Sequence, residues 1–191
     1  MAGPRLVLLN ILTPVQKWMQ TIGNPEPRIS YRFVREAVPL LMDGDILLSR
    51  EEWRLTNPFV PGTWGHAAIY RKGFAIEAIG SGVRREDIFR WMYQKDSIAV
   101  IRPVGLDPED MKGAAVIASQ QIGAPYDYLF EPSAKAFYCS ELITYAYDVV
   151  TCGKFPFKPR ESFGVETSTP QDLYNAISDG KFTLIIEEIN K

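Results

Sequence analysis

Short apolar runs, separated by turn residues, occupy the middle of the chain and constrain its fold most strongly. Such runs, rich in Ile, Val and Ala and bounded by glycine or proline, are typical of β-strands. We expect strands at residues 45–49, 66–70, 75–79, 97–102 and 182–186. Helical patterns are predicted at 85–93, 107–123 and 139–150 and from 169 onward, and 154–168 is expected to be a loop. Strands that cluster together, with most helices after them, indicate an α+β fold.

The size and charge of the chain exclude several classes of protein. Its 191 residues suit one domain, or one domain with an appendage. A hydrophobic content of 46% excludes wholesale disorder. The 21 Lys and Arg residues against 23 Asp and Glu give a net charge of −2, which argues against nucleic-acid binding. No apolar run is long enough to span a bilayer.

The N-terminal segment, residues 1–40, is expected to be a helical arm. Apolar residues repeat there at intervals of three and four, the pattern of one helix face. They are Leu8, Ile11, Leu12, Val15, Trp18, Met19 and Ile22. Because no small-residue cleavage site follows, the segment does not fit a secretory signal peptide. We expect the arm to pack on the domain. The alternative is peripheral contact with a membrane surface or with a partner protein.

The chain contains one histidine and two cysteines, so metal and redox sites are constrained. His66, Cys139 and Cys152 are fewer ligands than a structural zinc site uses, and the cysteines form no C-x-x-C pair. We therefore expect no metal and no cofactor. Unpaired cysteines and the lack of a cleavable signal favour a reducing compartment, the cytoplasm. The oligomeric state is not predicted.

A hairpin centred on Lys72-Gly73 is predicted to bring His66 close to Glu77. In a two-residue turn, Ala68 lies opposite Glu77 and His66 lies opposite Ile79. His66 and Glu77 are then diagonal neighbours on one face of the sheet. A buried carboxylate needs a partner, and an imidazole is a suitable one. The alternative is a solvent-facing Glu77, and a three-residue loop would move it to the other face.

Cys139 is predicted at the N-terminus of the helix 139–150, on its apolar face. A helix N-terminus and a nearby imidazolium both lower the pKa of a thiol, as a nucleophilic cysteine requires. The alternative is a buried cysteine that acts only as a small hydrophobic side chain. Cys152 lies at the other end of the same helix, where the dipole raises a thiol pKa, and we interpret it as structural.

Five segments in this order resemble the YiiX-like branch of the NlpC-type papain-like cysteine hydrolases. They are GDILL at 44–48, WGHAAIY at 64–70, AIEA at 75–78 with GV at 82–83, IGAPYD at 122–127, and FYCSEL at 137–142. The resemblance covers roughly residues 41–150, and it implies a circularly permuted papain-like catalytic core. In that fold, helices pack against a central antiparallel sheet, and the histidine precedes the cysteine. Residues 151–191 are then a C-terminal extension that packs on the core.

The resemblance also implies roles for individual residues. Cys139 would be the nucleophile, His66 the general base and then acid, and Glu77 the group that orients His66. Tyr126, Tyr138 and Trp64, within the matching segments, become candidates for substrate contact.

The function implied is hydrolysis of a peptide or amino-acyl amide through an acyl-enzyme. An acyltransferase or thioesterase acting on acyl lipids is the nearest alternative, and the apolar arm and abundant aromatic residues would suit it. A non-catalytic binding module that retains the cleft is another.

Overall fold

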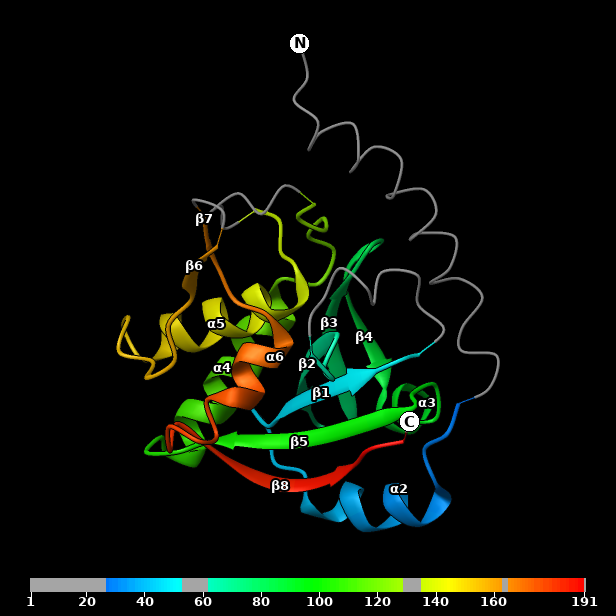
Figure 1. The fold of residues 1–191 in the computed structure, drawn as a ribbon. Coiled ribbons are helices and arrows are strands. Elements are labelled where there is room, and N and C mark those ends of the chain that lie inside the picture. The colour runs from blue at the N-terminus through cyan, green and yellow to red at the C-terminus, as the bar shows by residue number, and fades with distance from the viewer. Residues whose placement is uncertain (1–26, 53–61, 129–134, 163–164, 191) are drawn as a thin grey trace.

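The computed structural model describes residues 27–52, 62–128, 135–162 and 165–190. Six strands form one antiparallel sheet in the order β4-β3-β2-β1-β5-β8 (Figure 1). The strands are β1 Ile46–Arg50, β2 His66–Arg71, β3 Phe74–Ile79, β4 Gly82–Asp87, β5 Ser97–Pro103 and β8 Phe182–Glu188. Strands β2, β3 and β4 are consecutive hairpins, so the sheet grows outward from β1 in chain order on this side.

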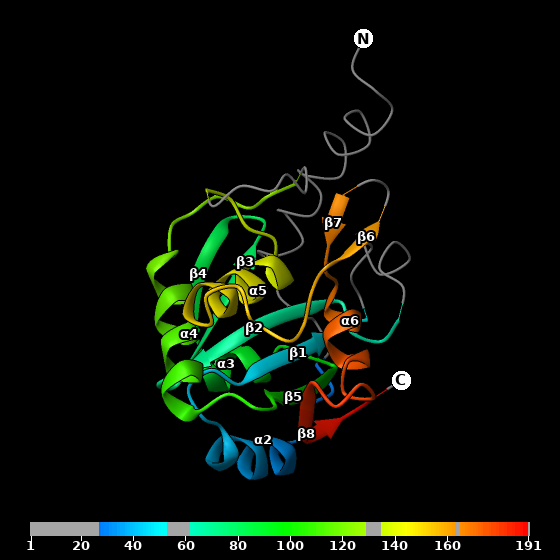
Figure 2. The same ribbon diagram turned by 90° about the vertical axis from the view of Figure 1, so that its left-hand side faces the viewer.

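Helices cover both faces of this sheet (Figures 1 and 2). Helices α2 Tyr31–Ala37 and α3 Ile88–Met92, with the 3-10 helix η1 Val38–Leu40, lie on one face. Helices α4 Pro108–Gln120, α5 Cys139–Val150 and α6 Pro170–Asn175 lie on the other. A separate two-stranded sheet is formed by β6 Arg160–Ser162 and β7 Val165–Thr167. The fold is α+β, as the sequence predicts.

Two hydrophobic cores result, one on each side of the sheet. Successive side chains of a strand point to opposite faces. In β1, Ile46 and Leu48 therefore enter the core beneath α4 and α5, whereas Leu47 enters the core beneath α2 and α3. Because both faces of the central strands are covered, β1 is buried continuously from Ile46 to Ser49 rather than at alternate positions.

The segment 85–93, predicted as one helix, is divided between a strand and a helix, so this prediction is wrong for its first residues. β4 continues to Asp87, paired with β3 from Ile79 opposite Gly82 to Phe74 opposite Asp87. Asp87 then caps α3, and its carboxylate accepts hydrogen bonds from the N–H groups of Phe89 and Arg90. Strand pairing outweighs the local helical pattern here.

Two further boundaries differ from the predictions. The predicted loop 154–168 contains the β6–β7 hairpin. The predicted helix 107–123 ends at Gln120. Its start is as expected, because Asp107 caps it and Pro108 occupies the first turn.

The chain ends pack differently from one another. The apolar stripe of the predicted arm, 8–22, lies outside the described residues. Residues 31–37 of the same segment form α2, whose Phe33, Val34 and Ala37 are buried against the sheet. At the other end, β8 pairs with β5 and becomes the edge strand.

No helix within the described part of the chain is long and apolar enough to cross a membrane.

Candidate active site

The β2–β3 hairpin sets the position of the histidine and the carboxylate. Lys72 and Gly73 have φ angles of 45° and 84°, and Arg71 lies opposite Phe74, which confirms the predicted two-residue turn. Ala68 lies opposite Glu77, also as predicted. The ladder ends there, however. The predicted pairing of His66 with Ile79 is wrong, because β2 and β3 separate beyond Ala68.

His66 and Glu77 are nevertheless hydrogen-bonded. The distance from His66 Nε2 to Glu77 Oε2 is 2.7 Å. Glu77 is only 1% exposed, which excludes the alternative of a solvent-facing carboxylate. Since an imidazole has two ring nitrogens, this bond leaves Nδ1 for a second partner.

The separation of β2 from β3 makes room for the cysteine. The Tyr70 N–H donates to the Asp45 carbonyl, toward β1. N–H directions alternate along an antiparallel strand, so the Ala67 N–H points away from β1, at the position where β3 has diverged. The Ala67 N–H, the Ser140 N–H and the His66 ring lie close enough to the Cys139 sulfur to lower the pKa of this thiol. Cys139 is the first residue of α5, as the sequence predicts.

These contacts favour a thiolate facing an imidazolium. Burial raises the pKa of Cys139, but the His66 ring and the N–H groups of Ala67 and Ser140 outweigh it, and the net pKa is lowered. Burial likewise lowers the pKa of His66, but Cys139 and Glu77 outweigh it, and the net pKa is raised. The two shifts have the directions that an ion pair between sulfur and imidazole requires.

Glu77 has additional partners that the sequence analysis did not identify. Arg84 donates to Glu77 Oε1 at 2.8 Å, and the Trp91 indole N–H donates to Glu77 Oε2 at 2.9 Å. Burial alone would raise the pKa of Glu77. The hydrogen bond and charge of His66, with the charges of Lys95 and Arg84, instead hold this pKa well below its usual range.

A second carboxyl group lies on the same helix turn as the cysteine. Glu141 Oε2 accepts the backbone N–H of Tyr138 at 3.2 Å, at the start of α5. Burial, with a smaller effect of the nearby Asp127, raises the pKa of Glu141 to about 7. Glu141 lies within the FYCSEL segment, but its neighbour Asp127 is distant in sequence, so the sequence analysis assigned it no role.

The three aromatic residues predicted to contact substrate occupy different environments. The Tyr138 hydroxyl accepts the Ser168 N–H at 3.2 Å, and burial raises its pKa to about 12, so the phenol is neutral. Tyr126 is half-buried, forms a β-bridge with Phe137, and has its ring 4.8 Å from that of Tyr128.

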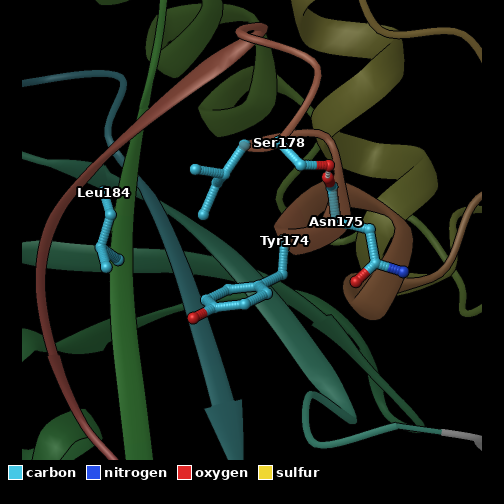
Figure 3. A pocket seen from close by; sticks show the side chains of 5 residues that line it. Tyr174, Asn175, Ser178 and Leu184 are labelled. Carbon is cyan, nitrogen blue, oxygen red and sulfur yellow. Dashed lines mark hydrogen bonds between the residues drawn. The ribbon is translucent and has the colours of Figure 1, made fainter.

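Trp64 does not fit the predicted role of substrate contact in this structure, because its side chain has no exposed surface. It is 0% exposed, and the centroid of the Tyr174 ring lies 5.3 Å from that of the Trp64 ring. Beyond Tyr174 a surface hollow of about 370 Å³ lies between α6 and β8 (Figure 3). Its lining includes Tyr174, Asn175 and Leu184, but not Trp64. Trp64 therefore contributes packing.

Cys152 lies in the turn that follows α5, at the opposite end of this helix from Cys139. It has a φ of 51° and is exposed, in contrast to the packed position that a structural interpretation implied. Both cysteines are free thiols. In the described part of the chain, no three His, Cys, Asp or Glu side chains are placed so as to hold a metal ion.

A cysteine at the start of a helix, a histidine on a strand beside it and a carboxylate behind the histidine form the arrangement of papain-like cysteine hydrolases. Here the histidine strand precedes the cysteine helix, as in a circular permutation. Residues 40–180 match the family described as permuted papain-like amidase enzymes, YaeF/YiiX, C92 family. The chain belongs to this family.

A solved structure supports the same fold. The crystal structure of metalloprotein yiiX from Escherichia coli O157:H7 superposes with a TM-score of 0.60 at 20% sequence identity. The alignment covers 78% of this chain and 98% of that one. No curated protein sequence matches this chain.

Proposed function

We propose that this protein is a cysteine amidase that cleaves an amide bond through an acyl-enzyme on Cys139. The observation that carries the proposal is the buried His66 ring, which hydrogen-bonds Glu77 through Nε2 and lies close enough to the Cys139 thiol for each group to shift the pKa of the other. An imidazole oriented by a carboxylate and facing a thiol can remove the thiol proton and later deliver it. Membership of a permuted papain-like amidase family supports the same chemistry.

The reaction has two halves. The Cys139 thiolate attacks the amide carbon, and the S–C bond forms. His66 then gives its proton to the leaving nitrogen as the C–N bond breaks. A water molecule next attacks the acyl carbon while His66 accepts a water proton. The S–C bond breaks, the acid leaves, and the thiolate and imidazolium are restored. The backbone N–H of Cys139, the first residue of α5, has no intrahelical acceptor and is the candidate donor to the oxyanion.

The first test is the reactivity of the Cys139 thiol. We expect iodoacetamide to alkylate Cys139 well below the ordinary thiol pKa of about 8.5. His66→Ala should remove this advantage. Cys152→Ser serves as the background, because it deletes the exposed thiol and leaves one alkylation site. Alkylation of Cys139 no faster than in the denatured protein would refute the proposal and favour a binding module.

The second test identifies the substrate class and the acceptor. Intact-mass spectrometry after exposure to a panel of peptidyl, amino-acyl and acyl-lipid donors should reveal an acyl group added to Cys139. Cys139→Ser is the control and should gain none. Release of the free acid in water supports hydrolysis of the amide. Transfer to an added amine or alcohol in preference to water would favour the acyltransferase, and selective loading by lipid donors would favour the thioesterase.

A further inference from the structure

Glu77 receives more hydrogen bonds than a simple histidine–carboxylate pair provides. Its Oε2 atom accepts both the His66 ring N–H and the Trp91 indole N–H, at 2.7 and 2.9 Å. Its Oε1 atom accepts from Arg84 at 2.8 Å. Trp91 is 0% exposed, so its indole cannot exchange this acceptor for water without local unfolding. Both carboxylate oxygens therefore have side-chain donors, and those on Oε2 are buried.

One continuous unit, β4 followed by α3, delivers both donors. Arg84 lies directly opposite Glu77 in the β3–β4 ladder, and directly opposite residues point to the same face. Trp91 follows on α3, whose start is set by the Asp87 cap. The Trp91 ring is in turn held beneath the Lys95 ammonium, 4.9 Å from the ring centroid. Lys95 forms a buried ion pair with Glu51.

We propose that Trp91 and Arg84 are positioning residues that lock Glu77 as an oriented anion, and so hold His66 directed at Cys139. This inference rests on the proposed function. Neither residue is among the groups that shift the pKa of Cys139, and each acts through Glu77. Because hydrogen bonds and positive charge both favour the ionised carboxylate, these residues also extend the imidazolium–thiolate pair toward lower pH.

The charged groups around Glu77 fix the sign of the expected pH effect. His66 from β2, Arg84 from β4 and Lys95 after α3 all bring positive charge toward it, and their effects lower its pKa. Glu86 Oε2 lies 3.5 Å from Arg84 Nη1, and Glu51 pairs with Lys95. Each of these carboxylates partly offsets the positive charge of its partner. Without one of these donors the Glu77 carboxylate can turn away from His66, which weakens the imidazolium and then the thiolate. The acid limb of Cys139 reactivity must therefore move to higher pH.

The test is the pH profile of Cys139 alkylation in full-length protein carrying Cys152→Ser, measured from about pH 4 to about pH 9. Trp91→Phe keeps an aromatic ring and loses the N–H. Arg84→Met keeps the stem and loses the charge. We expect each to move the acid limb upward by about one pH unit, which is about tenfold slower alkylation on that limb. Arg84→Lys, which keeps the charge, should restore part of the loss.

Arg85→Met is the matched control. Arg85 neighbours Arg84 on β4 but lies on the opposite face, with its guanidinium 5.0 Å from the centroid of the Phe74 ring. The pH profile of Cys139 alkylation in Arg85→Met should superpose on that of the parent protein. If Trp91→Phe fails to fold, the partly exposed Arg84 still provides the test, since its side chain is 40% exposed.

The outcomes separate this inference from the proposed function. An activated Cys139 in the parent, with acid limbs unchanged in both Trp91→Phe and Arg84→Met, would overturn the inference and leave the proposed function standing. An unactivated Cys139 in the parent would overturn both. A uniform loss of rate at every pH, without a shifted limb, would indicate a purely structural role and would also overturn the inference.

Discussion

Replacing Glu77 by glutamine should destabilise the protein by roughly 3 kcal/mol at neutral pH. Glutamine keeps the size of the side chain, but one oxygen becomes an NH2 group that cannot accept from Arg84, or from His66 and Trp91. Removing one partner of a buried ion pair costs about 3–5 kcal/mol. We take the lower end because Arg84 is 40% exposed and water can solvate it. The thermal midpoint should fall by about 6–12 °C.

The loss of unfolding free energy in Glu77→Gln should depend on pH in a defined direction. Burial would raise the pKa of Glu77, but His66, Lys95 and Arg84 hold it well below its usual range. The stabilisation from Glu77 is therefore complete above the unfolded pKa of about 4.3 and is lost as pH falls through the folded value. The pKa of His66 is raised, although its burial opposes this. Its contribution is therefore complete below about 6.5 and is lost as pH rises through the folded value.

The assay is urea unfolding of the parent and of Glu77→Gln at pH values from below about 4.3 to above about 6.5, the two unfolded pKa values. The difference in unfolding free energy should be greatest between the two unfolded pKa values and should narrow on both sides. Glu109→Gln is the control. Glu109 pairs with Lys112 at 3.0 Å, but its side chain is 81% exposed, so its loss should cost less than about 0.5 kcal/mol. If Glu77→Gln has the same urea midpoint and the same dependence of unfolding free energy on urea as the parent at neutral pH, the buried pairing does not stabilise the fold.

Two further predictions concern the scaffold of the site, and urea unfolding measures both. Gly82→Ala should destabilise by about 1–3 kcal/mol, because Gly82 has a φ of 111° and an added Cβ would lie 2.5 Å from the Ala124 carbonyl oxygen. Gly105 has a φ of 80°, and a Cβ added there would meet no atom within 4 Å, so Gly105→Ala should cost less than Gly82→Ala. Equal losses in the two variants would contradict the steric argument. Leu142→Ala should cost about 2–5 kcal/mol, because Leu142 is 0% exposed in the core beneath α5. Val149 lies on the same helix, but its side chain is 43% exposed, so Val149→Ala should be nearly neutral. If Leu142→Ala loses no more stability than Val149→Ala, the packing role of Leu142 is contradicted.

Local signals in the sequence were sufficient for several elements of the site. The Lys72-Gly73 turn correctly predicted the register of β2 and β3, because a two-residue turn determines which residues lie opposite one another. The apolar stripe after Cys139 correctly predicted a helix that starts there. The order of the motifs led to the permuted papain-like family. The catalytic roles of Cys139, His66 and Glu77 remain proposals.

Other features depended on contacts between distant segments. The helical pattern of 85–93 concealed the strand register that places Arg84 opposite Glu77, and nothing in the sequence placed Trp91 against the same carboxylate. The sequence also contained no sign that Trp64 is fully buried, with Tyr174, more than a hundred residues later, packed beside it.

The sequence by itself determined the hairpin, the cysteine helix and the α+β class, because turn geometry and side-chain periodicity act over a few neighbouring residues. Only the tertiary structure decided where the β2–β3 ladder ends, and that the Ala67 N–H comes close enough to Cys139 to lower the pKa of its thiol. It also decided how many donors Glu77 receives. These outcomes depend on how separate elements pack, and the free energy of burying a charge depends on every group that packing brings within reach.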